Sequence, residues 1–176
     1  MTTKRTKANT SAATKSGAKK SASASKKGAA PKATSAREPK TKATASSVSG
    51  FLAKVDAARR GDAEKLCAWM SEWTGSEPVL WGSNIVGFGT YSYSNGRGGS
   101  NDWPIVGFSP RATNLTVYLM DGFEGRDALL RRLGPHKLGK ACLYLKGLAG
   151  LDDGALKELV QSSVAAMRAR HPTARV

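Results

Sequence analysis

Apolar residues in the second part of the chain recur with two spacings, one typical of helices and one typical of strands. A first helical stripe begins at Phe51, after Ser47 or Ser49 as N-cap, and is interrupted at Gly61. Asp62 is the predicted cap of a second helix. Its apolar positions follow the i, i+3, i+4, i+7 spacing of a buried helix face: Leu66, Trp69, Met70 and Trp73. An aromatic stripe at this spacing predicts core packing.

Alternation of apolar and polar residues with period two predicts four strands. They cover residues 81–93, 103–109, 115–120 and 141–146. The glycine-rich segment 95–101 is typical of a hairpin loop between the first two strands. Pro104 lies near the start of the second strand, where a missing N–H does least harm.

Two further helices complete the predicted fold. Residues 124–133 form one of them, and Asp152 or Asp153 caps the last, which stops at His171. The buried stripe of this last helix consists of Leu156, Leu159, Val160, Val164 and Met167. The sequence therefore predicts an α+β domain over residues 49–172, with an antiparallel sheet of about four strands and helices before, between and after it.

A glycine- and lysine-rich loop joins the third predicted helix to the fourth predicted strand. Gly134, Gly139 and Lys140 match the GxxxxGK spacing of a phosphate-binding P-loop, but that motif needs a strand before the loop and a helix after it. The order here is reversed, and Ala141 stands where a Ser or Thr would hold magnesium. We interpret the segment as a helix-to-strand connection with Gly134 as the helix C-cap.

Charge is distributed differently from hydrophobicity along the 176 residues. Residues 1–48 carry ten Lys and two Arg against one Glu, a net charge of +11, whereas the whole chain carries +15. They contain no Leu, Ile, Phe, Trp or Tyr. Such a segment cannot bury enough apolar surface to offset its ordering entropy, about 1–2 kcal/mol per residue. We expect a disordered basic tail.

The tail resembles the Lys/Ala/Pro-rich tails of linker histones and bacterial histone-like proteins, which implies binding to nucleic-acid backbone. Spaced lysines on a flexible chain neutralise phosphates and release counterions without reading sequence. The residues expected to contact DNA or RNA are Lys4, Arg5, Lys7, Lys15, Lys19, Lys20, Lys26, Lys27, Lys32, Lys40 and Lys42. The alternatives are a solubilising appendage and a membrane-surface or targeting role.

Three segments of the domain resemble successive blocks of the YdhG-like domain, a bacterial family of small α+β proteins of unknown function. They are 81–93 (WGSNIVGFGTYSY), 102–120 (DWPIVGFSPRATNLTVYLM) and 133–152 (LGPHKLGKACLYLKGLAGLD). The resemblance spans residues 50–167 and implies the α+β fold. One branch of the family is associated with a frataxin-like iron-chaperone role, which relies on carboxylates clustered along the first helix. Here acidic residues are interspersed with basic ones: Asp56, Asp62, Glu64 and Glu72 among Lys54, Arg59, Arg60 and Lys65.

Cations and aromatic residues of the domain are the candidates for ligand binding. Arg111 follows the second predicted strand, and Lys140 precedes the fourth. If they converge, they form a small basic pocket with aromatic walls, suited to a carboxylate, a phosphate or a nucleic-acid backbone. The candidate residues are Arg111, His136, Lys137, Lys140, Tyr91, Tyr118, Tyr144 and Trp81. The alternative is that the aromatic residues pack the core and the cations are solvated.

Other chemistry finds little support in the sequence. The two histidines lie far apart, without a neighbouring Cys or carboxylate pair, so we expect no metal site. Cys67 and Cys142 fit small buried hydrophobes in a reducing compartment. Ser109 lacks the flanking glycines of a nucleophile elbow. We expect no enzyme and no cofactor. No apolar run of 18 residues occurs, so we expect no transmembrane helix. We expect no membrane partner and a cytoplasmic or nucleoid-associated protein.

These patterns together predict a non-enzymatic binding protein. Its tail holds DNA or RNA backbone non-specifically, and its YdhG-like domain binds a small anionic ligand or a protein partner. The alternative is a frataxin-like iron chaperone or small-ligand carrier in which the tail is incidental.

Overall fold

The computed structural model describes residues 41–96 and 98–176, and its α+β architecture confirms the predicted class. The helices are α1 (Val48–Leu52), α2 (Ala57–Thr74), α3 (Asp127–Leu133) and α4 (Asp153–Arg170). The strands are β1 (Ala43–Thr44), β2 (Pro78–Trp81), β3 (Ile85–Phe88), β4 (Tyr91–Ser94), β5 (Ser100–Trp103), β6 (Val106–Pro110), β7 (Leu115–Leu119), β8 (His136–Leu138) and β9 (Cys142–Leu145). In this part of the chain no helix has both the length and the apolar composition to cross a bilayer.

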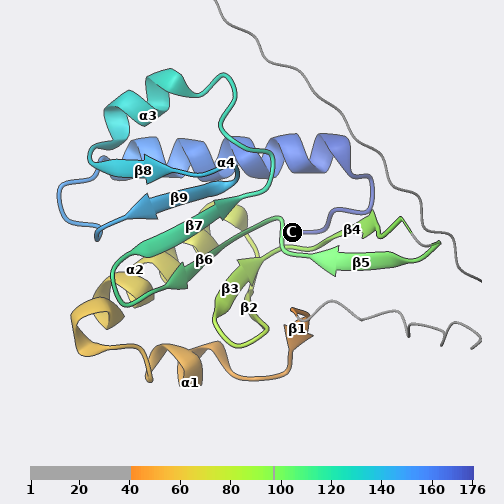
Figure 1. Cartoon of the computed structure of the whole chain (residues 1–176), viewed down its shortest axis with the longest axis horizontal. Coiled ribbons are helices and arrows are strands. Elements are labelled where there is room, and N and C mark those ends of the chain that lie inside the picture. The colour runs from red at the N-terminus through yellow and green to blue at the C-terminus, as the bar shows by residue number, and fades with distance from the viewer. Residues whose placement is uncertain (1–40, 97) are drawn as a thin grey trace, which may run out of the picture. The chain divides into compact units, whose positions relative to one another are not determined.

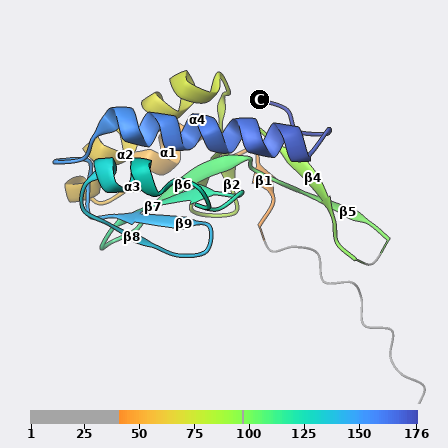
Figure 2. The ribbon, with the colours of Figure 1, turned by 90° about the horizontal axis from the view of Figure 1, so that it is seen from above.

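Seven of the described strands form one antiparallel sheet, in the order β1-β2-β3-β6-β7-β9-β8 (Figure 1). The strands β4 and β5 pair separately as a two-stranded ribbon. The helices lie on one side of the large sheet, so its other side has no helix over it (Figure 2). The predicted sheet of about four strands is therefore too small.

Two glycines and a proline account for part of the additional strands. Gly82 (φ +60°) and Gly89 (φ +64°) adopt left-handed backbone and divide the expected strand 81–93 among β2, β3 and β4. Pro104 separates β5 from β6 within the expected strand 103–109. The connection before the fourth predicted strand, expected to be a loop, contains β8.

The end of the segment predicted to be disordered takes part in the fold. Residues 1–40 lie outside the described residues, but β1 pairs with β2, and the N–H of Gly82 donates to the carbonyl of Lys42 (2.8 Å). Ser47 caps α1, as one of the two expected residues, by accepting a hydrogen bond from the N–H of Gly50 (3.2 Å). Regular structure therefore begins before the predicted boundary at residue 49.

The second helix begins earlier than predicted. Asp56, rather than Asp62, caps α2 by accepting a hydrogen bond from the N–H of Ala58 (2.9 Å). Gly61 lies within this helix instead of interrupting it. The carboxylate of Asp62 accepts a hydrogen bond from the N–H of Leu148 (3.2 Å), which ties α2 to the segment after β9.

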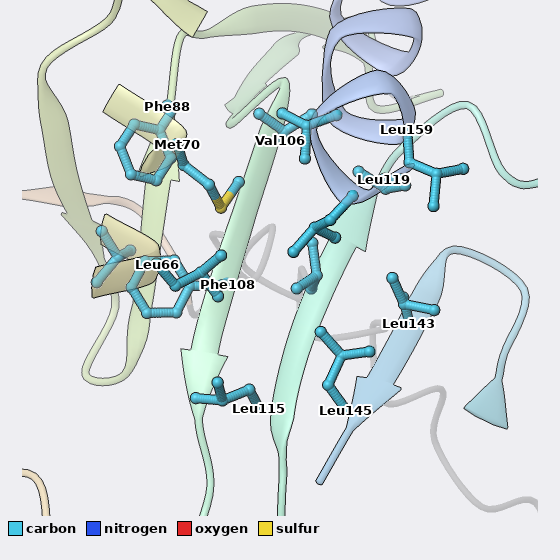
Figure 3. Packing of buried hydrophobic residues seen from close by; sticks show 14 of the residues in the cluster. Leu66, Met70, Phe88, Val106, Phe108, Leu115, Leu119, Leu143, Leu145 and Leu159 are labelled. Carbon is cyan, nitrogen blue, oxygen red and sulfur yellow. The ribbon is translucent and has the colours of Figure 1, made fainter. Parts of the chain in front are cut away.

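The core lies between the large sheet and the helices α2 and α4 (Figure 3). Leu66 and Met70 of α2 and Leu159 of α4 are fully buried, as their helical spacing predicts. They meet the inward side chains of the strands, which are Val86, Phe88, Val106, Phe108, Leu115, Val117, Leu119, Leu143 and Leu145. Each such side chain contributes about 1.5–3 kcal/mol through burial.

A buried ion pair holds the end of β7 against the helices. The carboxylate of Asp121 pairs with Arg126 and accepts a hydrogen bond from Ser163 of α4. The Asp121 side chain is only 4 % exposed, so its charge is neutralised and hydrogen-bonded inside the fold. This contact fixes one end of the strand that carries the site described next.

Candidate functional site

The side of the sheet without helices gathers four of the eight predicted ligand-binding residues. Tyr118 on β7 and Tyr144 on β9 alternate with buried core residues, so both point to this side. Lys137 on β8 pairs directly with Tyr144. Arg111 follows β6, and its Nη2 donates to the Oη of Tyr118 (3.3 Å). We call these four residues the tyrosine face. The side of the sheet without helices is the one turned toward the viewer in Figure 1.

Glycines pair with or lie next to the two tyrosines, and they differ in the space around them. Gly107 of β6 pairs with Tyr118, but β3 fills the space over this glycine, because a Cβ there would lie 2.8 Å from the carbonyl oxygen of Val86. Gly139, in the turn between β8 and β9, lies under Tyr144, because a Cβ at this position would be 3.3 Å from Cε2 and Oη of that ring. The Tyr144 side chain is 36 % exposed, and the Tyr118 side chain is half-buried.

The tyrosine face is positively charged. Arg111 and Lys137 are both exposed. The outward positions of the four described strands β6, β7, β9 and β8 include no Asp or Glu; they are Gly107, Ser109, Thr116, Tyr118, Cys142, Tyr144 and Lys137. Because Ser109 and Thr116 are buried, an anion here meets the two cations and the phenols, without acidic neighbours on these strands.

The phenol of Tyr144 is held in its neutral form. Its pKa is raised chiefly by hydrogen bonding with Cys142, then by the charge of Cys142, by desolvation and by the nearby Tyr118. A neutral phenol can donate a hydrogen bond as well as accept one, and its ring offers an aromatic surface. The tyrosine face can therefore bind anionic oxygen atoms and planar rings together.

Arg111 and Lys140, whose convergence would create a basic pocket, lie beside opposite ends of β7. Arg111 is in the turn between β6 and β7, before the strand begins. Lys140 precedes Ala141, whose carbonyl accepts a hydrogen bond from the N–H of Leu119 at the end of β7 (3.0 Å). The length of the strand thus separates their backbones, and Lys140 is not part of the tyrosine face.

The remaining predicted residues have local packing contacts. Trp81 is 2 % exposed, and its ring centroid lies 6.0 Å from that of Trp103. Tyr91, on the two-stranded ribbon, has its ring centroid 4.5 Å from that of His171. The Nδ1 atom of His136 lies 2.8 Å from a backbone carbonyl oxygen two residues earlier. The structure therefore does not bring these three residues to the tyrosine face.

A groove beside Arg111 is a feature that the sequence analysis missed. This cavity of about 270 Å³ lies between the start of α2 and the turn after β6, and it is lined by Phe51, Lys54, Val55, Asp56, Arg59, Pro110, Arg111 and Ala112. The guanidinium of Arg59 donates to the carbonyls of Thr113 (3.1 Å) and Lys146, which fixes it between helix and sheet. No local pattern predicts the groove, because its two walls are far apart in sequence.

The carboxylates and the Cys67 thiol, which could in principle bind metal or react, take part in contacts that maintain the fold. Within residues 41–96 and 98–176, no three His, Cys, Asp or Glu side chains come together to hold a metal ion. Asp56 and Asp62, two of the carboxylates relevant to iron binding, each accept a backbone hydrogen bond. Burial raises the pKa of the Cys67 thiol to about 11, so this thiol is protonated at neutral pH.

Comparison with known proteins does not place this chain in a family. The sequence matches no family model, and neither a curated protein nor a solved structure matches it. The YdhG-like resemblance therefore stays an expectation from the sequence.

Proposed function

We propose that the protein binds nucleic acid and catalyses no reaction. Residues 1–48 contact the phosphate backbone, and the tyrosine face of the domain adds a second contact with anionic groups. The observation that carries this proposal is the segregation of charge. The first 48 residues supply +11 of the net +15, whereas every Trp, Tyr and Phe lies after residue 50. Lysines spaced along a segment without aromatic residues favour binding through phosphates, without sequence preference.

The tyrosine face supports the second contact because its guanidinium is held in place. Tyr118 accepts a hydrogen bond from one nitrogen of Arg111, which orients the group while leaving its other donors for a ligand. Arginine binds phosphate through two parallel N–H groups, and a lysine such as Lys137 adds a point charge. A phosphate or carboxylate that approaches this side of the sheet would meet both cations.

The contribution of the tail is tested with the full-length protein. In one variant nine tail lysines are changed to Gln: Lys4, Lys7, Lys15, Lys19, Lys20, Lys26, Lys27, Lys32 and Lys40. In the matched control the same nine lysines become Arg, so the charge is kept. Binding to a fluorescent 30-base-pair duplex is measured by anisotropy over a series of salt concentrations.

We expect the slope of log K against log salt to be about −9 for the natural protein, if about ten tail charges engage the duplex. The Gln variant should lose about 8 units of that slope, and the Arg variant should keep it. An unchanged slope in the Gln variant would show that the tail does not contact phosphates.

The contribution of the tyrosine face needs a separate pair of variants. Arg111→Gln with Lys137→Gln removes two charges from the face, and Lys157→Gln with Arg168→Gln removes two from α4, on the helix side. The first pair should reduce the salt slope by about 2, because two phosphate contacts are lost. The second pair should leave the slope unchanged. Equal effects of both pairs would mean that only net charge matters and that the face is not a contact.

A further inference from the structure

We infer that the tyrosine face binds the bases of single-stranded nucleic acid by stacking them on Tyr118 and Tyr144. This inference rests on the proposed nucleic-acid function and deepens it, because it names the kind of strand and the chemical group that the domain recognises. The tail contacts phosphate in any nucleic acid. The domain would add a preference for bases that are not paired.

The positions of the two tyrosines suit adjacent bases. Tyr118 pairs with Cys142 and Tyr144 pairs with Thr116, so the tyrosines are diagonal neighbours on adjacent strands. Diagonal neighbours lie about 7–8 Å apart and point to the same side of a sheet. Sheet surfaces that bind RNA use aromatic side chains arranged in this way to stack about two or three bases.

The charges around the rings fit a strand of nucleic acid that crosses the sheet. Arg111 lies at the Tyr118 ring, and Lys137 lies opposite Tyr144, so a cation accompanies each aromatic surface. A base can stack on the ring while the neighbouring phosphate meets the cation. In a duplex the bases are already stacked and paired inside the helix, and the rings would have nothing to contact. The face therefore selects single strands.

The same charges disfavour a second copy of this chain as the occupant of the face. A symmetric dimer brings the same surface patch of both subunits together. Arg111 and Lys137 of one copy would then lie next to those of the other, and the outward positions of the four strands offer no acidic partner. Like charges placed together in an interface cost several kcal/mol. A polyanion has the complementary charge.

Three labelled probes of equal length test the inference with the full-length protein: a 30-nucleotide thymidine strand, a 30-nucleotide abasic strand and a 30-base-pair duplex. The abasic strand has the same backbone charge as the thymidine strand but no bases. The variant is Tyr118→Leu with Tyr144→Leu, which removes both rings, and the control is Tyr118→Phe with Tyr144→Phe, which keeps them. Circular dichroism and thermal melting check that each variant is folded.

The natural protein should bind the thymidine strand more tightly than the abasic strand. Loss of a stacking ring costs about fivefold or more in affinity, so the Leu variant should bind the thymidine strand about 25-fold or more weakly. Its affinity for the duplex and for the abasic strand should fall less and by a similar factor, because the change also removes the Tyr118 hydroxyl that orients Arg111. The Phe variant also loses this hydroxyl but keeps both rings, so it should retain the natural preference for the thymidine strand over the abasic strand.

Equal affinity of the natural protein for thymidine and abasic strands would overturn the inference, and this result does not need a folded Leu variant. A dimer in sedimentation velocity that the Leu change abolishes, with oligonucleotide binding unaltered, would overturn it in favour of a second copy. Failure of the proposed function looks different. In that case changing the nine tail lysines to Gln has no effect on the duplex, whatever the thymidine and abasic strands show.

Discussion

On the helix-covered side of the sheet, Val86, Phe108 and Leu143 are fully buried, whereas on the opposite side Tyr118 and Tyr144 remain partly accessible. The same strands supply both sets of side chains, because successive residues point to opposite sides. On the covered side, close packing of the core restricts the size and shape of every side chain. On the other side the positions near β2 and β3 pack around Trp81, while those on β7, β9 and β8 carry phenols and cations. The difference separates the residues that maintain the fold from those available for binding.

Neighbouring residues of β9 give the sharpest test of this difference. Leu143→Ala removes a fully buried side chain and leaves a cavity, so it should lower the free energy of unfolding by about 2–5 kcal/mol. Tyr144→Ala, one residue later and on the other side, should cost about 1 kcal/mol or less. Urea unfolding followed by circular dichroism measures both. Similar losses for the two variants would mean that the tyrosine face is part of the core.

Gly87 tests the packed part of the uncovered side, and Gly61 in α2 serves as the comparison. A Cβ at Gly87 would lie 2.5 Å from Cβ of Pro104 and 2.6 Å from Cδ1 of Trp81, so Gly87→Ala should cost about 1–3 kcal/mol through overpacking. At Gly61, within α2, a Cβ meets no atom within 4 Å. Gly61→Ala should therefore stabilise the protein by about 0.5–1 kcal/mol through helix propensity. Thermal melting of both variants checks the opposite signs, and a neutral Gly87→Ala would show that Trp81 can move.

The stability of the protein should also depend on alkaline pH. Burial raises the pKa of Cys67 to about 11 from its ordinary value of 9.0, so the unfolded chain loses this proton at lower pH than the folded protein does. The resulting stability is fully present below pH 9 and is lost as the pH rises from 9 to 11. Cys67→Ala removes this contribution. Its deficit relative to the natural protein in urea unfolding should shrink between pH 8 and pH 11, and a constant deficit would contradict the assignment.

Local sequence patterns were sufficient to predict the elements in which a single periodicity holds from one end to the other. The stripe of α4 and the alternation of β7 were predicted correctly, because each period holds over the whole element. The segment 81–93 was predicted wrongly as one strand. Its alternation continues across the turns at Gly82 and Gly89, so a period of two does not distinguish one strand from several. Glycine allows a left-handed turn but does not signal that one is made.

The candidate site was likewise predictable only in part from the sequence. The types of residue at the tyrosine face could be proposed from the sequence, because exposed Arg, Lys and Tyr suggest binding. Their grouping could not, because the pairing of β7 with β9 and of β8 with β9 decides it. The same pairing separates Lys140 from Arg111. The groove that contains Lys54 and Arg59 depends on how α2 docks on the sheet, which residue spacing does not express.

The pairing of β1 with β2 has a practical consequence for any shortened form of the protein. A chain that began at residue 49 would lose this two-residue strand and leave the backbone of Leu80 and Trp81 open at the margin of the sheet. Unpaired strands of this kind recruit other chains and aggregate. Val79, already 37 % exposed in the adjoining strand, would add an apolar contact. A deletion that removes the tail should therefore stop no later than residue 40, so that self-association is not mistaken for a change in nucleic-acid binding.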